Sequence, residues 1–425
     1  MPNVPTTHPA SARERAPARR QDELRVTLLS GGSDKPYVLG LTEALVSEGV
    51  HVDVIGSDEL DVPAMQARAL VTFRNLRGDQ RESAPILVKT RRILAYYGRL
   101  MAYSAVSGSR LFHILWNNRF ELLDRTALML YYRACGKRLI LTAHNVNAAR
   151  RNNCDTVLNR WSLRVQYRLC DHVFVHTPAM KAELLTDFGV PEERVTVIPF
   201  GLNDTAPKTS LSRAGARAAL NLDADHRVVL FFGQIAPYKG LEYLVDAFGT
   251  AAAADPALRL LIAGKIKRGS ENYWDDVRTA IGASPVSDRI HVAARFIPDD
   301  EVERYFKAAD VVALPYTAIY QSGLPFLAYA FGAPVVATDV GALRDDVVEG
   351  TTGFVCPPRN AEALARALGM FFESELYRDR EHRRRMIREW VVERHSWAVV
   401  GKATRGVYEA VLAERTGSGE VEHAV

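Results

Sequence analysis

The stretch RVVLFFGQIAPYKGLEYLVDAF (residues 227–248) decides the fold, because it contains a strand, a turn and a helix in succession. Residues 227–232 are continuously apolar, as is typical of a strand that is covered on both faces. Gly233 breaks the run, Pro237 marks a turn, and a helical stretch begins near Gly240. The stretch therefore predicts the repeating unit of a parallel sheet with crossover helices.

Units of this kind recur along nearly the whole chain of 425 residues. In the first half we expect strands at 25–30, 50–56, 110–116, 138–145, 171–177 and 194–199. In the second half we expect them at 227–233, 258–264, 289–295, 310–316, 334–341 and 353–358. Residues 201–226 are rich in Gly, Asn, Asp, Pro and Ser, which places a domain boundary there. The pattern predicts an α/β protein of two doubly wound parallel-sheet domains that face each other across a cleft.

Composition is that of an ordinary globular protein, with 48% apolar and 24% charged residues. The four cysteines form no C-x-x-C pair, so reduced cytosolic thiols are expected. Residues 1–23 are Pro-, Ala- and Arg-rich and predict a disordered tail without the apolar core of a signal peptide. Because no apolar run reaches the ~20 residues that span a bilayer, we expect a cytoplasmic protein, peripheral at the inner face of the membrane.

Positive charge is concentrated in one part of the sequence. The net charge is +4, yet residues 68–170 carry nineteen Lys or Arg against five Asp or Glu. Around 89–110 these cations alternate with Tyr96, Tyr97 and Tyr103, a mixture that suits an anionic membrane surface or a phosphate-bearing lipid. A plain solvated basic face is the simpler alternative. Nucleic acid is disfavoured, because no helix-turn-helix, zinc or RNA-binding motif accompanies the charge.

Three constellations could carry chemistry at the carboxyl ends of the expected strands. The first is the loop FFGQIAPYKG (231–240), in which glycines let backbone approach a phosphate and Lys239 adds a full charge before a helix N-terminus. A solvated lysine on a structural turn is the alternative. The second is His144 with Asn145, at the end of the strand 138–145. A lone histidine is more often structural, but a strand's carboxyl end favours a role in the cleft.

The third is TAIYQSGLPFLAYAFGAPVVATDVG (317–341), which has no charged side chain between Ser322 and Val336. Ser322 is expected to cap a helix whose first turn contains Pro325, so that free amides at 322–324 form an anion cradle. A well-capped buried helix is the alternative. A further loop, Gly31-Gly32, departs from the G-x-G-x-x-G pattern, which argues against a nicotinamide-dependent oxidoreductase.

In their order and spacing these stretches resemble the retaining nucleotide-sugar glycosyltransferases of the GT-B fold, in particular family 4 (group 1). The resemblance covers most of the chain and rests on FFG…KGLEYLVDAF, LRLLIAG, ADVVALPY, GLPFLAYAFGAPVVATDVG and GFVCPP. It implies two Rossmann-like domains, an acceptor domain over 24–203 and a nucleotide-sugar domain over 204–395. It also implies a helix over 396–414 that returns to the N-terminal domain, followed by a tail over 415–425.

The resemblance assigns roles to particular residues. It implies that Lys239 holds the donor diphosphate, that backbone N–H groups of Gly323 and Leu324 bind the same phosphates, and that His144 lies near the transferred sugar. Lys239 and His144 are the expected catalytic residues. The expected nucleotide-sugar set is Gly31, Gly32, Gly233, Gln234, Lys239, Gly264, Arg295, Ile297, Tyr320, Ser322, Gly323 and Leu324.

Three positions depart from the family's pattern. Gln234 stands where an arginine usually follows the loop glycine, and the usual pair of glutamates falls on Tyr320 and Ala328. The second glutamate normally binds the ribose, which alanine cannot do. The site is therefore expected to rely on backbone amides and Lys239.

We therefore expect a hexosyltransferase that uses a UDP- or GDP-sugar and a lipid-linked or saccharide acceptor, in cell-surface polysaccharide or glycolipid assembly. No metal is expected, because no Asp-x-Asp pair is present, and no cofactor beyond the donor. The alternatives are a non-catalytic nucleotide-sugar-binding or scaffold protein, which Gln234 and Ala328 favour, and a GT-B epimerase or phosphorylase, whose signatures are not evident. The sequence leaves the sugar, the base, the acceptor and the oligomeric state open.

Overall fold

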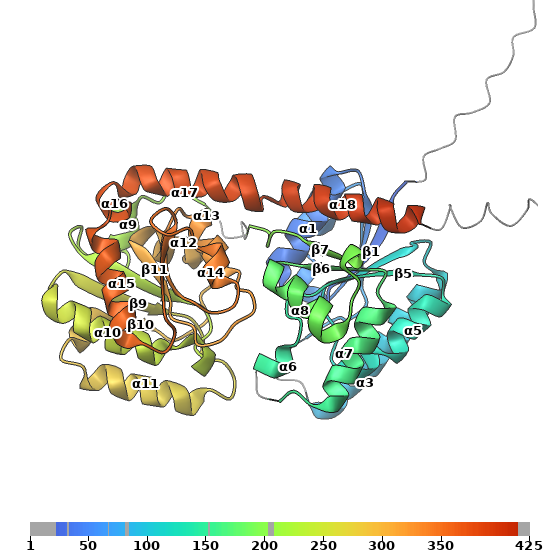
Figure 1. Cartoon of the computed structure of the whole chain (residues 1–425), viewed down its shortest axis with the longest axis horizontal. Coiled ribbons are helices and arrows are strands. Elements are labelled where there is room, and N and C mark those ends of the chain that lie inside the picture. The colour runs from blue at the N-terminus through green and yellow to red at the C-terminus, as the bar shows by residue number, and fades with distance from the viewer. Residues whose placement is uncertain are drawn as a thin grey trace, which may run out of the picture.

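The computed structural model of the protein describes residues 23–31, 34–66, 68–80, 85–151, 154–202 and 208–414. The expected tails at 1–23 and 415–425 lie outside the described residues except for Glu23, and so does Gly32. Two α/β bodies lie side by side, and the C-terminal helices run along one side of both (Figure 1). Each body has its own sheet with helices packed around it.

The first sheet comprises seven strands among the described residues, in the order β3-β2-β1-β4-β5-β6-β7. Every neighbouring pair is parallel, as the apolar runs predicted. The strands are β1 (Arg25–Leu29), β2 (His51–Gly56), β3 (Val71–Asn75), β4 (Leu111–Ile114), β5 (Arg138–Thr142), β6 (His172–Val175) and β7 (Val195–Val197).

Helices connect these strands and cover the sheet. The helix α1 is capped by Asp34, whose side chain accepts from the amide of Tyr37, and α8 is capped by Thr177 and ends at Gly189 in the left-handed region. The helices are α1 (Lys35–Ser47), α2 (Pro63–Gln66), α3 (Ile86–Val106), α4 (Glu121–Arg125), α5 (Ala127–Ala134), α6 (Ala148–Arg151), α7 (Val157–Leu169) and α8 (Pro178–Phe188), with 3-10 turns η1 (Asp58–Leu60) and η2 (Glu192–Arg194).

The second sheet comprises six described strands, in the order β10-β9-β8-β11-β12-β13. All its pairings are parallel as well. The strands are β8 (Arg227–Phe232), β9 (Leu258–Ala263), β10 (Ile290–Ala293), β11 (Val311–Leu314), β12 (Val335–Thr338) and β13 (Gly353–Cys356). The strand order reverses between β8 and β11, as it does between β1 and β4 in the first sheet, and such switch points are where ligands bind in doubly wound folds.

The second half of the chain supplies the remaining helices. The helix α10 begins directly after Gly240, as the opening stretch predicted. The elements are α9 (Arg213–Ala218), η3 (Pro237–Lys239), α10 (Leu241–Ala254), α11 (Glu271–Ala283), η4 (Ser287–Arg289), α12 (Asp299–Ala308), α13 (Leu324–Ala330), α14 (Leu343–Asp346), α15 (Ala361–Glu373), α16 (Glu375–Arg378), α17 (Arg380–His395) and α18 (Trp397–Ala413).

A buried ion-pair network fixes the first helix of the second body to its sheet. Asp310, just before β11, is 3% exposed and accepts from Nη2 of Arg217 at 2.8 Å and from the amide of Val228 at 2.8 Å. Arg213 binds the other oxygen of the same carboxylate. The network joins α9, β8 and β11. Part of the segment 201–226, which the sequence marked as a domain boundary, is therefore fixed to the second sheet.

The chain crosses between the two bodies twice, near residues 200 and 396. The two crossings are joined, because Leu202 N donates to His395 O at 2.8 Å and Trp397 Nε1 donates to Leu202 O at 2.8 Å. The final helix α18 then packs on α1, where a Cβ at Gly40 would lie 1.9 Å from the Trp397 ring. Tyr408 of α18 also reaches into the first body, and its hydroxyl lies 2.6 Å from Nδ1 of buried His113.

These observations confirm the α/β fold of two parallel-sheet, Rossmann-like domains. The strand β3 was not predicted. It lies at the edge of the first sheet, alternates between exposed and half-buried residues, and therefore lacks the continuous apolar run of the other strands. In the part of the chain that the structure describes, no helix combines the length and the apolar character needed to cross a membrane.

Candidate active site

Two glycines shape the loop that follows β8. Gly233 has φ 112° and Gly264, at the end of the neighbouring strand β9, has φ 150°, both values that disfavour a side chain. A Cβ on Gly264 would lie 1.8 Å from the carbonyl oxygen of Gly233. The two strand ends therefore come together as bare backbone, which leaves room for a ligand to approach the main chain.

Lys239 lies on the turn η3, between this loop and α10. Its Nζ is 3.7 Å from the ring centroid of Tyr316, which is fully buried after β11. Gly240 has φ 63°, and a Cβ there would lie 2.1 Å from the carbonyl of Pro315, so the turn is held close against the end of β11. The ammonium group thus sits at the switch point between β8 and β11, where the sequence predicted it.

The other predicted residues of this loop system differ in accessibility. Gln234 is exposed, and the Arg295 side chain is exposed and pairs with Glu301 at 2.5 Å. Ile297 is 6% exposed, so only its backbone is available to a ligand. Arg295 therefore already has an acidic partner. A nucleotide base that binds beside Arg295 would also lie close to Glu301.

The helix start in the stretch 317–341 differs from the prediction. Gly323, and not Ser322, is the N-cap of α13, and the cap has no side-chain hydrogen bond. The Ser322 hydroxyl instead accepts from the amide of Leu324 at 3.3 Å, so this amide is not free as expected. The reason is that Ser322 is buried one residue outside the cap, with its hydroxyl folded over the first turn.

Tyr320 makes a contact across the cleft that the sequence did not indicate. Its hydroxyl lies 3.1 Å from the carbonyl oxygen of Asn147, and 3.3 Å from Oε1 of Glu183 on α8. Both partners belong to the first body, so Tyr320 ties the second body to it. Ala328 is fully buried in the core of the second body and does not line the cleft. The side chain at position 328 therefore faces the core in this structure, and the absence of a ribose-binding acid there stays a prediction.

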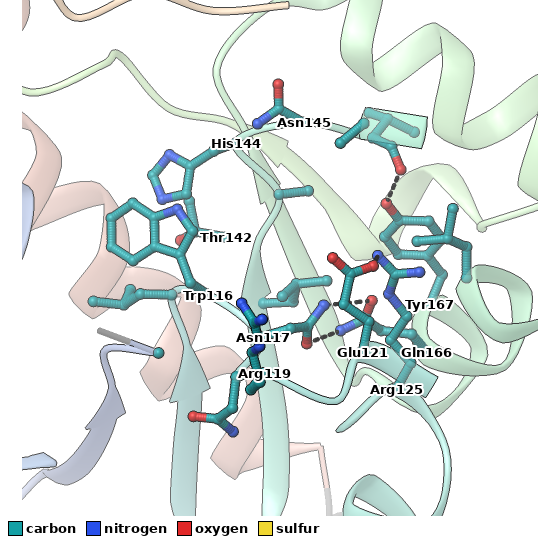
Figure 2. Close-up of a pocket in the computed structure, with 18 of the residues that line it drawn as sticks. Trp116, Asn117, Arg119, Glu121, Arg125, Thr142, His144, Asn145, Gln166 and Tyr167 are labelled. Carbon is teal, nitrogen blue, oxygen red and sulfur yellow. Dashed lines mark hydrogen bonds and ion pairs between the residues drawn. The ribbon is translucent and has the colours of Figure 1, made fainter. Parts of the chain in front are cut away.

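A cavity of about 420 Å³ opens at the carboxyl ends of β1, β4 and β5. Figure 2 shows His144 and Trp116 stacked on one side of it and Glu121 and Arg125 on the other. Gly31 also lines the cavity, and its φ of 59° fits a position where a Cβ would lie 2.4 Å from the carbonyl of Trp116. The structure thus brings Gly31 and His144 together at one cavity, whereas their predicted roles toward the nucleotide sugar stay predictions.

His144 is held by a chain of hydrogen bonds whose direction can be worked out. His176 Nδ1 lies 3.3 Å from the carbonyl oxygen of Ile198, which only accepts, so Nδ1 of His176 carries the proton. Its Nε2 then accepts, and His144 Nδ1, 3.0 Å away, donates. This leaves Nε2 of His144 as an acceptor, buried and without a partner among the described residues. Burial and nearby His176 hold the pKa of His144 well below its ordinary value, so the ring is neutral.

Sequence reasoning missed the aromatic surroundings of His144. Trp116 stacks parallel to it at 4.2 Å between ring centroids, and Tyr37 meets it edge-on at 4.6 Å. His176 follows β6 just as His144 follows β5, so the rule about strand ends could have found it. Tyr316, beneath Lys239, also follows a strand. Trp116 follows β4 in the same way, whereas Tyr37 lies in helix α1 and gave no such signal.

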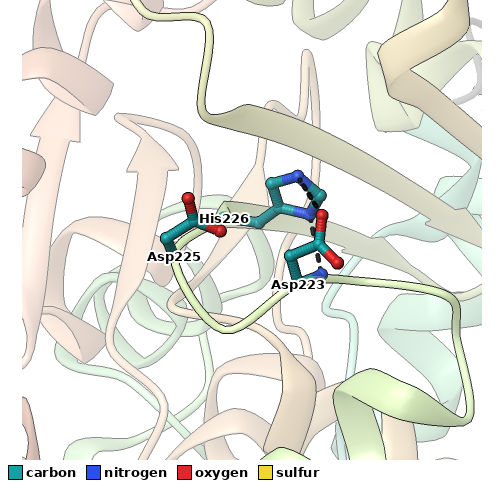
Figure 3. Close-up of side chains that lie close together, drawn as sticks. All are labelled: Asp223, Asp225 and His226. Atoms are coloured by element: carbon teal, nitrogen blue, oxygen red, sulfur yellow. Dashed lines mark hydrogen bonds and ion pairs between the residues drawn. The ribbon is translucent and has the colours of Figure 1, made fainter.

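A group of possible metal ligands lies outside this site. Asp223, Asp225 and His226 lie together on the turn before β8 (Figure 3). That turn is at the amino end of the strand, the edge opposite Gly233 and Lys239. The ring of His226 already accepts from the amide of Asp223 at 3.0 Å, so the arrangement serves the turn. The expectation of a metal-independent reaction stays a prediction.

With the geometry in place, comparison with known families defines the class of protein. Residues 36–205 match the family described as Glycosyltransferase Family 4, and residues 212–390 match Glycosyl transferases group 1. The two matches are consecutive and fall on the two bodies. The chain therefore belongs to the glycosyltransferases of the group 1 and family 4 type.

Individual relatives agree with this family. The chain is 28% identical to an uncharacterized glycosyltransferase of Methanocaldococcus jannaschii over 58% of its length and 61% of that protein. It is 32% identical to the D-inositol 3-phosphate glycosyltransferase of Nocardia farcinica over 58% of its length and 54% of that protein. The matched part of the chain thus spans between half and two thirds of the length of these relatives.

Solved structures share the fold over almost the whole chain. Sucrose-phosphate synthase from Thermosynechococcus elongatus superposes with a TM-score of 0.72 at 22% identity, covering 92% of this chain and 100% of that one. HepE of Anabaena, solved in complex with UDP and glucose, gives 0.71 at 16% identity, with coverage of 91% and 100%. At these identities the likeness establishes the two-domain fold alone.

Proposed function

We propose that the protein is a retaining hexosyltransferase that moves a sugar from a UDP- or GDP-sugar to a lipid-linked or saccharide acceptor. The observation that supports this most directly is the placement of Lys239. It lies at the switch point between β8 and β11, near Gly233 at the end of β8 and Gly264 at the end of the neighbouring strand β9, and bare backbone with one cation suits a diphosphate. The cavity with His144 lies in the other body and suits the acceptor.

The proposed reaction does not need an acidic side chain as a nucleophile or a base. In the front-face mechanism the departing diphosphate accepts the proton of the acceptor hydroxyl, on the same face of the sugar as the leaving bond. The protein then has to stabilise charge on the leaving phosphate and hold the reactants together. Lys239 supplies the charge. Polar contacts come from Gln234 and from the first turn of α13, because the amides of Gly233 and Ile235 already donate to the carbonyl groups of Ala263 and Lys265.

His144 has a defined part in this proposal. Because its free Nε2 is an acceptor, it binds a hydroxyl group of the transferred sugar and does not protonate a leaving group. Its pKa, far below the ordinary value, keeps it neutral throughout the working range. His144 is thus a positioning acceptor and Lys239 the group that stabilises the leaving phosphate.

The biological setting is the coarser part of the proposal. The basic segment 68–170 suits a protein that works at the inner face of a membrane, in assembly of a cell-surface polysaccharide or glycolipid. UDP-sugars are the first donors to test, since HepE was solved with UDP. Phosphorylated acceptors are the second set of compounds to test, because one relative is named a D-inositol 3-phosphate glycosyltransferase.

A non-catalytic nucleotide-sugar-binding protein is the second candidate. It is favoured by Gln234, which leaves the diphosphate with one cation fewer, and by Tyr320, which occupies the cleft with a contact to Asn147. Loss of one charge-assisted hydrogen bond costs about 1.5–3 kcal/mol, which slows transfer but does not abolish it. We therefore favour the enzyme.

A donor panel separates the two candidates. UDP- and GDP-sugars are screened by thermal shift, and the best binder is incubated with lipid extracts and simple saccharides, followed by analysis of products and of their anomeric configuration. Transfer with retention supports the proposal. Donor binding without transfer or slow hydrolysis supports the binding protein, and a product of inverted configuration rules out the retaining mechanism.

A further inference from the structure

We propose that the acceptor is a lipid-linked phosphate, whose phosphate binds between Arg77 and Arg119 and whose chain lies along the start of helix α3. This inference deepens the proposed function and rests on it. It concerns the acceptor half of the site, for which the family resemblance assigned no residue.

The first observation is that two cavities share a wall. The cavity beside His144, of about 420 Å³, and a second one, of about 550 Å³, are both lined by Arg77, Asn118 and Arg119. The second cavity opens along α3 and is bordered on its far side by Arg268 of the other body. A ligand that fills both would pass the two arginines midway, with one end beside His144 and the other end on the surface.

The second observation is that these arginines have unused hydrogen-bonding capacity. Nη1 of Arg77 is buried and has no partner in the described part of the chain, and its guanidinium lies 5.1 Å from the centroid of the Tyr96 ring. Arg119 is exposed, and no ion pair or hydrogen bond of its side chain is found among the described residues. A phosphate, with several acceptor oxygens, matches two such guanidinium groups.

The charge around the shared wall is otherwise balanced. Arg125 pairs with Glu121 at 2.5 Å, and Arg92 pairs with Asp79 at 3.2 Å. Asp124 lies nearby and is 3% exposed; its Oδ1 accepts from Tyr97 and Asn118, and burial raises its pKa although Arg77 attracts the carboxylate. Arg77 and Arg119 are thus the cations that line both cavities without an ion pair among the described residues, and an anionic group is the ligand that suits them.

The third observation identifies the rest of the ligand. The second cavity is lined by Ile86, which is 82% exposed, and by Phe120, which is 46% exposed and stacks on Tyr97 at 5.7 Å. Leu87, next to Ile86, is 83% exposed. Apolar side chains of this size are costly to leave in water, and beside cations they suit an isoprenoid or acyl chain that enters from a membrane. A free sugar phosphate would use the arginines but not this apolar edge.

The test measures binding to phosphatidylcholine vesicles that contain farnesyl phosphate, farnesol or phosphatidylserine, each at the same mole fraction. The proposal expects much stronger co-sedimentation with farnesyl phosphate vesicles than with farnesol or phosphatidylserine vesicles. Arg119→Gln, on an exposed side chain that folding does not need, and Arg77→Gln should each weaken it roughly ten-fold or more. Arg110→Gln is the matched control, since it removes the same charge at the opposite end of β4 and should change binding less than two-fold.

The remaining arms distinguish the source of the phosphate. Ile86→Ser should weaken binding to farnesyl phosphate vesicles, and inorganic phosphate should compete only weakly. Equal binding to farnesol or phosphatidylserine vesicles, unaffected arginine variants, or equal affinity for inorganic phosphate would each overturn the proposal. UDP binding, followed in the same samples by thermal shift, separates this failure from that of the proposed function: intact UDP binding with no preference for farnesyl phosphate refutes only the lipid acceptor.

Discussion

At the scale of single residues, the site depends on a few side chains that have an unusual partner. Lys239 rests on the ring of Tyr316, and Nε2 of His144 has been left as an acceptor by the hydrogen bonds of His176. Tyr320 extends across the cleft to Asn147 and Glu183. The carboxylate named among these contacts, that of Glu183, binds the Tyr320 hydroxyl, and the proposed mechanism does not need it, because the leaving diphosphate takes the proton.

We predict that Tyr320→Phe loosens the closure of the cleft without abolishing nucleotide binding. The variant removes the hydroxyl that contacts Asn147 and Glu183, a loss of about 0.5–1.5 kcal/mol for a hydrogen bond of this kind. Amide hydrogen exchange should become faster around residues 145–150 and in α8. Tyr243→Phe, on α10, is the control, and exchange as slow as in the wild type would contradict the cross-cleft role.

At the scale of elements, short segments around each sheet are fixed by buried polar groups. The helix α9 is only six residues long, too short to be stable by itself, and it is held to β8 and β11 through Asp310. Arg217, its partner, is 3% exposed. The buried contacts of Asp310 therefore hold α9 against the second sheet.

We predict that Asp310→Ala lowers the free energy of unfolding of the second domain by about 3–5 kcal/mol, because it leaves Arg217 buried without a counter-charge. Asp255→Ala is the comparison, since the Asp255 pair with Arg227 at 2.9 Å is partly exposed and contributes about 1 kcal/mol or less. Urea unfolding measures both. Equal losses in the two variants would show that burial of the Asp310 pair is not what matters.

Much of the element order could be predicted from the sequence. Continuous apolar runs ending in glycine marked β8 and β9, and the loop with Lys239 followed from the same rule. What could not be predicted depends on contacts between distant segments. The edge strand β3 has no apolar run. The N-cap of α13 depends on how Ser322 is buried, and Ala328 faces the core because of how α13 packs. Likewise, Arg77 and Arg119 lie far apart in sequence and meet only at the cavity wall.

At the scale of the whole molecule, two domains are joined by two crossings that bind each other. His395, Leu202 and Trp397 link the crossings, and α18 then docks on α1. The first domain also buries four histidines in a neutral state, and burial lowers the pKa of one of them, His172, to about 4. Burial lowers the pKa of His113 to about 3 and that of His176 to about 4, and the pKa of His144 lies well below its ordinary value.

These histidines predict how stability depends on pH. Below about pH 6.5 the unfolded chain takes up protons that the folded protein refuses, so the free energy of unfolding falls by about 1.4 kcal/mol per pH unit for each histidine. Asp346 opposes them, because burial raises its pKa to about 8 and the folded state keeps its proton. Denaturant unfolding between pH 7 and pH 5 should show a fall, and Asp346→Asn should steepen it. Stability that is constant or rises toward pH 5 would contradict the neutral burial of these rings.

The central claim is that Lys239 provides the charge that binds the donor diphosphate. Calorimetric titration of UDP and GDP into the wild type, Lys239→Ala and the remote surface control Lys402→Ala tests it most directly. The account predicts that the better nucleotide binds the wild type and the control equally. It also predicts that Lys239→Ala weakens this binding roughly ten- to a hundred-fold, because a charge-assisted contact to phosphate is lost. Unchanged affinity in Lys239→Ala, with the protein still folded, would contradict the account.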